Sequence, residues 1–160
     1  MKVKLLSKGA QVPKKATDQA AGFDLYVPKN TVIYPGRNIV SLDFSVAIPL
    51  GLEGQIRPRS GFSAKGMEGY QYVDKNSINN LDGDASRYDA DVLIGTIDSD
   101  YRGCVGVLVK SEESEPFIIV QGTRIAQLVI APYTIVGIEE TDNLDTTERG
   151  EGGFGHTGTK

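Results

Sequence analysis

The sequence predicts an all-β protein, folded as a sandwich or a barrel. Three observations support this: short runs rich in valine, isoleucine and tyrosine recur along the chain, proline and glycine separate them, and patterns with helical spacing are scarce. Many short apolar runs between turn residues are typical of β-sandwiches and β-barrels. With 160 residues, the chain can build one domain with a proper core but not two.

Turn residues divide the chain into its expected strands. Pro28, the pair at 35–36 and the turn at 49–51 separate the early runs, and Pro116 precedes a later one. Proline lacks an N–H group and glycine tolerates turn conformations, so both mark strand ends. The expected strands are, in order, 3–6, 23–27, 31–34, 38–48, 52–57, 92–97, 104–109, 117–120, 124–130 and 135–139.

Two polar segments interrupt this pattern. Residues 67–91 are long for a loop in a compact β domain, which predicts a functional or partly mobile segment inserted in a barrel domain of residues 1–140. Residues 141–160 form a tail with five glycines between Gly150 and Gly158. Such a tail buries too little apolar surface to order itself, so we expect a mobile arm that binds something, with a frayed terminus as the plain alternative.

The bulk composition excludes several classes of protein. A net charge of -4 argues against a protein that coats nucleic acid or anionic membranes. Cys104 is the one cysteine, which rules out an internal disulfide, and we expect it to be a small buried hydrophobe. With one histidine as well, a structural zinc site is disfavoured. The apolar runs are too short for a signal peptide or a membrane span, so we expect a soluble cytoplasmic protein with no membrane or nucleic-acid partner.

Residues 95–103 carry the strongest chemical signal. They place Asp98, Asp100, Tyr101 and Arg102 in one reversal between two apolar runs, which predicts a hairpin. Asn-Gly or Asp-Gly would suffice to reverse the chain. The segment therefore suits a carboxylate base beside a stacking ring, although a solvated turn would have the same appearance.

Four further clusters are ambiguous when each is taken alone. Residues 58–65 could open a short helix whose free N–H groups and Arg59 suit phosphate, or form an ordinary capped turn. Residues 149–158 are rich in glycine, but they lack the strand-to-helix context of a P-loop. Asp24, Arg124 and Gln127 lie within apolar runs, where polar groups at strand edges are commonplace.

Together and in this order, the five clusters resemble the five signature motifs of the trimeric deoxyuridine triphosphatase (dUTPase) family. The matching segments are Ala-Gly-Phe-Asp-Leu at 21–25, Pro-Arg-Ser-Gly at 58–61, Gly-Thr-Ile-Asp-Ser-Asp-Tyr-Arg-Gly at 95–103, Arg-Ile-Ala-Gln-Leu at 124–128 and Arg-Gly-x-Gly-Gly-Phe-Gly-x-Thr-Gly at 149–158. The third and fifth motifs are highly specific, and the resemblance covers most of the chain.

The resemblance implies a jelly-roll-like, distorted β-barrel that assembles as a homotrimer with shared active sites. It also implies hydrolysis of dUTP to dUMP and pyrophosphate with Mg²⁺, which keeps uracil out of DNA and supplies dUMP for dTMP synthesis. Asp98 would be the general base that activates water for attack on the α-phosphorus. Tyr101 would stack under the deoxyribose, and Gly95, Thr96 and Ile97 would line the uracil slot.

The other motifs supply phosphate contacts by the same resemblance. Asp24 would reach Mg²⁺ through water. The phosphate chain would be held by Arg59, Ser60 and Gly61 of a neighbouring subunit and by Gln127. The tail would close over the substrate through Arg149, Phe154, Gly155, His156 and Thr157.

The chain departs from the family pattern at two places. His156 replaces the usual serine, which we interpret as a tolerated exchange, with an added positive charge against the γ-phosphate as the alternative. Residues 67–91 are longer than usual, which favours a surface elaboration over a protein-binding arm or a modifier of base selectivity. Three other functions stay open: a dCTP deaminase-like enzyme, a pyrophosphatase for another deoxynucleotide, and a non-catalytic nucleotide-sensing or protein-binding module.

Overall fold

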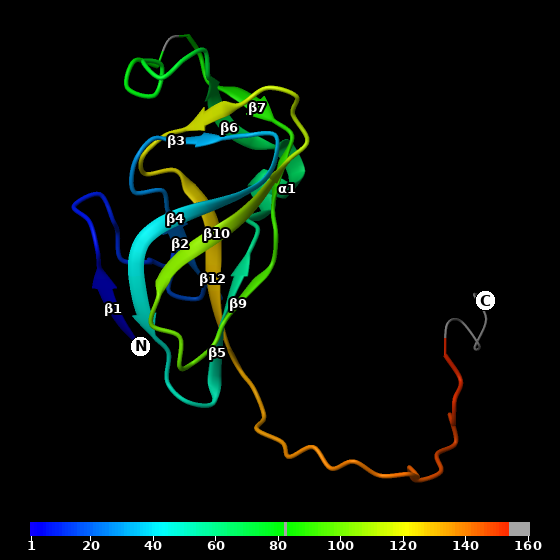
Figure 1. The fold of residues 1–160 in the computed structure, drawn as a ribbon. Coiled ribbons are helices and arrows are strands. Elements are labelled where there is room, and N and C mark those ends of the chain that lie inside the picture. Colours follow the sequence, from blue (N-terminus) through cyan, green and yellow to red (C-terminus); the bar gives the residue numbers. More distant parts are fainter. Residues whose placement is uncertain (82, 154–160) are drawn as a thin grey trace.

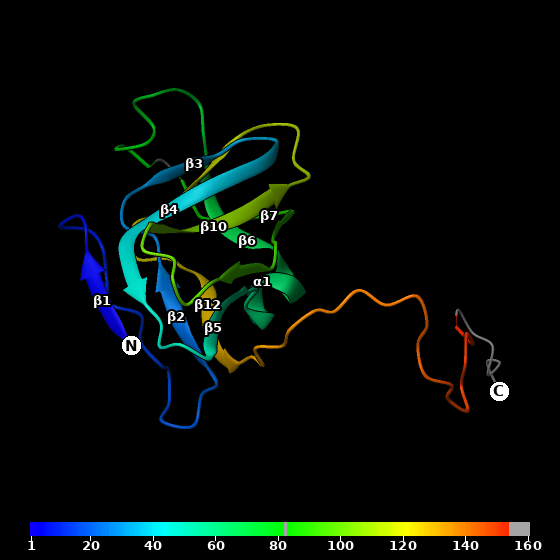
Figure 2. The same ribbon diagram turned by 60° about the horizontal axis from the view of Figure 1, so that its bottom comes forward.

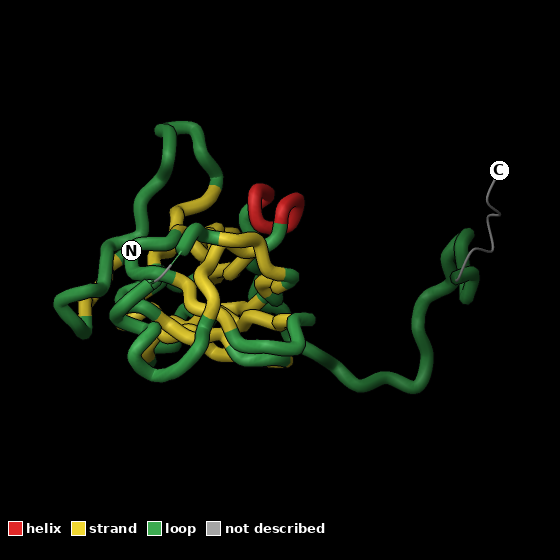
Figure 3. Tube along the Cα trace, turned by 90° about the horizontal axis from the view of Figure 1, so that it is seen from above, coloured by secondary structure: helices red, strands yellow, loops and turns green. Residues whose placement is uncertain are grey.

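Apart from one short helix, the regular secondary structure of the described residues is all β-strand, as the sequence predicts, and long loops join the strands (Figures 1 and 3). The computed structural model describes residues 1–81 and 83–153. In this part of the chain, no helix is long and apolar enough to cross a membrane. The elements are β1 (Lys2–Leu5), β2 (Gly22–Tyr26), β3 (Thr31–Ile33), β4 (Gly36–Ala47), β5 (Leu52–Arg57), α1 (Ser60–Lys65), β6 (Met67–Gln71), β7 (Ser86–Tyr88), β8 (Ala90–Val92), β9 (Gly95–Ile97), β10 (Cys104–Ser111), β11 (Phe117–Ile119) and β12 (Arg124–Pro132).

Within residues 1–81 and 83–153, the strands form three antiparallel sheets of four strands around a common core. Their orders are β1-β4-β10-β8, β3-β11-β6-β7 and β2-β12-β5-β9. Alternation along β4 and β10 explains which side chains enter the core, because successive residues of a strand point to opposite faces. Val40, Leu42, Phe44 and Val46 of β4 are buried, and so are alternate residues of β10 from Val105 onward.

The run predicted as one strand over 92–97 is two strands in different sheets. β8 pairs with β10, whereas β9 pairs with β5. Between them the Leu93 N–H still donates to the Leu108 carbonyl, over 2.9 Å, and the chain then turns away from β10. The predicted hairpin between β9 and β10 is therefore wrong, because β9 finds its partner in another sheet.

The polar segment 67–91 is also more ordered than predicted. It contains β6, β7 and the start of β8, so the irregular part is restricted to residues 72–85. These strands contain exposed polar residues such as Glu68 and Arg87, so they do not read as apolar runs in the sequence. Met67 and Gly69 of β6 are buried.

The strand predicted over 135–139 does not form. Ile135, Val136 and Ile138 are 70%, 71% and 98% exposed, in an arm that leaves the barrel after β12 (Figures 1 and 2). Where the arm begins, the Tyr133 N–H donates to the Gly51 carbonyl over 3.0 Å. Beyond this residue the described part of the arm extends away from the three sheets. These apolar residues match the pattern of a strand, but no part of the described chain packs against them and buries them.

Candidate active site

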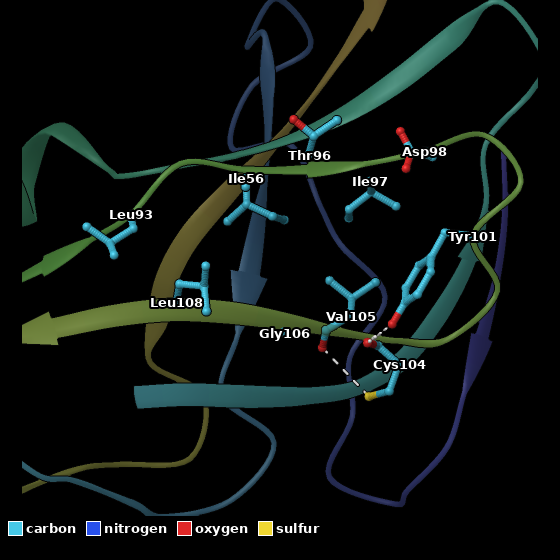
Figure 4. A pocket seen from close by; sticks show the side chains of 11 residues that line it. Ile56, Leu93, Thr96, Ile97, Asp98, Tyr101, Cys104, Val105, Gly106 and Leu108 are labelled. Carbon is cyan, nitrogen blue, oxygen red and sulfur yellow. Dashed lines mark hydrogen bonds between the residues drawn. The ribbon is translucent and has the colours of Figure 1, made fainter. Parts of the chain in front are cut away.

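A pocket of about 210 Å³ opens where β9 separates from β10 (Figure 4). One edge of β9 pairs with β5, and its other edge faces the pocket. An unpaired strand edge presents backbone N–H and C=O groups in a row, which suits a planar ligand with a donor and acceptor pattern. The pocket is lined by Ile56, Leu93, Gly95, Thr96, Ile97, Asp98, Tyr101, Cys104, Val105, Gly106 and Leu108.

The structure thus brings together the predicted base, the predicted ring and the predicted uracil slot. Their mutual position is fixed by the turn after β9, in which the Tyr101 N–H donates to the Asp98 carbonyl over 3.1 Å. The Arg102 guanidinium donates to the carbonyls of Ser99 and Tyr101, both at 2.7 Å. Arg102 was not among the predicted site residues, although it lies in the same motif.

Cys104 is an exposed residue at the start of β10, so the prediction of a buried hydrophobe is wrong. It occupies an outward position of the strand, and the alternation buries its neighbour Val105 instead. Its carbonyl accepts a hydrogen bond of 3.1 Å from the Tyr101 hydroxyl, and its Sγ lies 3.2 Å from the Ser41 Oγ. The sequence signal that could have placed it in the site is its position directly after the 95–103 motif.

A second cluster gathers three more of the predicted motifs around Asp24. Arg59 Nε lies 3.0 Å from Asp24 Oδ1, and Arg124 donates to Asp24 Oδ2 over 3.3 Å. Gln127 pairs across the sheet with Asp24 on one side and with Arg57 on the other, because β12 lies between β2 and β5. The central strand of this sheet therefore joins segments that are far apart in the sequence.

A pocket lined by basic side chains lies beside the short helix α1, next to this cluster. Arg59 precedes the helix and its carbonyl accepts from the N–H groups of Phe62 and Ser63, so Ser60 is the first helical residue. Ser60 and Gly61 are exposed at this end. A pocket of about 390 Å³ beside it is lined by four basic side chains, one acid and four other residues: Arg59, Lys65, Arg87, Arg124, Glu68, Gly61, Phe62, Gly122 and Thr123. Such an excess of positive charge favours a phosphate-bearing ligand.

The predicted site residues therefore fall into three separate groups within one chain. Asp98 and Tyr101 line the first pocket, Arg59 and Gly61 line the second, and Arg149 lies on the arm, where its Nε donates to the Gly152 carbonyl over 2.8 Å. The predictions for Phe154, Gly155, His156 and Thr157 fall outside the described residues.

Magnesium could be held here only with help from a substrate. The described residues contain no group of three or more His, Cys, Asp or Glu side chains that could hold a metal ion. Each oxygen of Asp24 already accepts from an arginine, but a carboxylate has about four acceptor positions, so a metal-bound water still fits. Mg²⁺ commonly keeps several waters and binds through substrate phosphates, which agrees with this donor set.

Comparisons with known proteins give the family. A family model described as dUTPase matches residues 8–81 and 84–158. The deoxyuridine 5′-triphosphate nucleotidohydrolase of Syntrophotalea carbinolica is 41% identical over 99% of this chain and 96% of its own, and that of Corynebacterium glutamicum is 39% identical over 99% and 94%.

A solved structure agrees in fold over nearly the whole chain. The dUTPase of Staphylococcus bacteriophage 80alpha, solved with dUPNHPP, has a TM-score of 0.78 and 27% identity, covering 98% of this chain and 97% of its own. This likeness confirms the expected jelly-roll-like fold. With a family model over most of its length and relatives about 40% identical from end to end, the chain belongs to the dUTPase family.

Proposed function

We propose that this protein hydrolyses dUTP to dUMP and pyrophosphate. The observation that carries the proposal is the pocket between β9 and β10, where an open strand edge, the Asp98 carboxylate and the Tyr101 ring meet in a member of the dUTPase family. Substrate and product are soluble nucleotides, so we place the enzyme in the cytoplasm. There it would keep uracil out of DNA and supply dUMP for dTMP synthesis.

The pocket supports recognition of a deoxyuridine. The backbone of Gly95, Thr96 and Ile97 would bind the uracil edge, much as a paired base does. Tyr101 would pack under the sugar and leave no room for a 2′-hydroxyl. Aromatic rings gain by stacking on flat or apolar surfaces, so the same ring adds affinity and selectivity.

The chemistry would fall to Asp98 and to the phosphate-binding groups. Asp98 would orient and deprotonate a water for attack on the α-phosphorus, while Arg59, Ser60, Gly61 and Gln127 hold the phosphate chain. Phosphoryl transfer depends mainly on positioning and on neutralising charge, which such groups supply. Bound Mg²⁺ would neutralise charge on the phosphate oxygens, with Asp24 in contact through water.

We further propose a homotrimer in which neighbouring chains complete each site. The separation of the Asp98 pocket from the Arg59 pocket supports this, because one dUTP would need both kinds of group. The arm supports it as well, since Ile138 and Leu144 are 98% and 86% exposed on a segment that leaves its own barrel. Large exposed apolar surfaces commonly mark contacts with another chain.

The arm would close over the substrate in this assembly. Arg149 and Thr157 would bind the γ-phosphate, Phe154 would cover the uracil, and Gly155 and His156 would contribute through the backbone. Closure excludes water and strengthens the charge contacts within the site.

A substrate panel tests the proposed function. We expect pyrophosphate from dUTP with Mg²⁺, little from UTP, and no ammonia from dUTP, dCTP or dTTP. Ammonia from dCTP would instead indicate a deaminase, and preferred turnover of dTTP or dCTP to pyrophosphate would indicate another base. No turnover of any nucleotide would leave the non-catalytic module as the better explanation.

A further inference from the structure

Gly103 lies directly against the Tyr101 ring at the wall of the nucleotide pocket. A methyl group in place of its hydrogen would lie 2.2 Å from the Tyr101 hydroxyl oxygen, 2.4 Å from Cζ and 2.9 Å from Cε2. Non-bonded carbon atoms prefer separations of about 3.5–4.0 Å. Any other residue at 103 would therefore force the Tyr101 ring to move.

Two hydrogen bonds hold Tyr101, one through its ring hydroxyl and one through its backbone. The ring hydroxyl donates to the Cys104 carbonyl over 3.1 Å, as Figure 4 shows, and the backbone N–H of Tyr101 donates to the Asp98 carbonyl. Tyr101 is 44% exposed, so no deep packing fixes the ring. The local contacts around Gly103 must do so instead, because an exposed side chain otherwise samples several rotamers.

We propose that Gly103 is a specificity-determining position of this enzyme, which selects deoxyribose by fixing the Tyr101 ring against the sugar. The inference rests on the proposed function and deepens it. A side chain at 103 would displace the ring from the position it now holds, and a displaced ring would no longer exclude a 2′-hydroxyl. Gly103 is a positioning residue, because it acts through Tyr101 and not through contact with the reacting atoms.

The test compares the ratio of kcat/KM for dUTP to kcat/KM for UTP. Gly103→Ala should lower this ratio about tenfold or more, because a change of one methylene in the fit between pocket and substrate alters the ratio of kcat/KM values for two substrates by about 10–200-fold. Asp100→Asn is the control, because Asp100 lies in the same turn but does not line the nucleotide pocket, and the ratio should stay at the wild-type value.

A double-mutant cycle separates positioning from a merely structural role. In a Tyr101→Ala background there is no ring to displace, so adding Gly103→Ala should not change the ratio further. An equal additional fall in both backgrounds would overturn the proposal, and so would a folded Gly103→Ala enzyme with the wild-type ratio.

Folding of the variants is also informative. If Gly103→Ala unfolds while the double variant folds, the clash with the ring is confirmed; if both unfold, glycine is needed for the backbone and the proposal fails. Failure of the wild-type enzyme to hydrolyse dUTP would overturn the proposed function, and this outcome is distinct from an unchanged ratio in the variant.

Discussion

Asp98 and Asp100 lie two residues apart in the same exposed turn, but they differ in their access to the proposed nucleotide pocket. Both carboxylates line a second pocket with Glu53 and Tyr133, but of the two only Asp98 also lines the pocket between β9 and β10. The structure therefore offers a matched pair of carboxylates with similar exposure and unequal access to the nucleotide.

Replacing Asp98 by Asn should lower kcat by about 10²–10⁴-fold, because the amide cannot accept the proton of the attacking water. The affinity for a non-hydrolysable dUTP analogue should change little, since size and hydrogen-bonding shape are kept. Asp100→Asn should leave kcat within about twofold of wild type by the same reasoning. A large loss in both variants would indicate a general charge effect and contradict the assignment of Asp98 as the base.

At the scale of the elements, Tyr88 of β7 joins the least regular part of the chain to the core. Its ring stacks on that of Phe117 in β11, with centroids 4.2 Å apart and planes 3° from parallel. Burial raises the pKa of Tyr88 above its ordinary value of 10.0, and the negative charge of Glu113 raises this pKa further. Both causes disfavour the phenolate in the folded protein.

The raised pKa predicts how stability depends on alkaline pH. Below about pH 10 the phenol is neutral in both states, and above it the unfolded chain ionises first. The stabilisation linked to Tyr88 should therefore be lost as pH rises from about 10 through the folded-state pKa. Urea unfolding at several pH values should show a weaker decline for Tyr88→Phe than for wild type, and equal slopes would refute the link.

The loop at 72–85 is attached to the barrel at the end of β6 and β7 that lies away from α1 (Figure 1). Asn30 holds it through a hydrogen bond of 2.7 Å from Nδ2 to the Ile78 carbonyl, and Tyr72 meets Tyr34 edge to face. The pocket of Asp98 lies between other strands, so these contacts concern the loop and not the nucleotide.

Replacing residues 72–83 by Asn-Gly, a turn suited to a two-residue hairpin, should leave kcat/KM for dUTP within about twofold. Stability should fall by about 1 kcal/mol for the lost Asn30 hydrogen bond, partly offset by the shorter loop. An altered preference among dUTP, dCTP and dTTP would instead show that the loop modifies the base pocket.

Sequence patterns predict elements well where burial decides the residue types. The alternation of β4 and the apolar runs of β10 and β12 are visible in the sequence because one face of each enters the core. β6 and β7 escape the same search, since hydrogen bonds to neighbouring strands hold their polar residues in place. Pairing partners are not encoded locally, and this also explains the wrong hairpin at β9.

The candidate site likewise has a part that the sequence predicts and a part that depends on strand pairing. Its residues could be named from motifs, because chemistry restricts which side chains serve as base, ring or phosphate ligand. The pocket itself could not, because it exists only where β9 leaves β10 to pair with β5. Gly103 and Arg102 act through contacts with Tyr101 and the turn carbonyls, which no spacing rule reveals.

At the scale of the whole molecule, the two pockets and the arm predict that chains share their active sites. An Asp98→Asn chain retains the basic pocket, and an Arg59→Ala chain retains the base. Each variant alone should be nearly inactive, because every site in its homotrimer lacks one of the two groups. In mixed trimers, some sites would combine the intact Asp98 of one chain with the intact Arg59 of another.

Co-expressing the two variants with different affinity tags, and purifying through both tags, should therefore recover a substantial fraction of wild-type turnover. Light scattering should give the mass of three chains for the mixed and the parent proteins. A mixture of Asp98→Asn chains carrying the two tags is the control and should stay inactive. Activity cannot return if each site is built within one chain, since no chain in the mixture carries both groups; a correctly assembled but inactive mixed trimer would thus exclude shared sites.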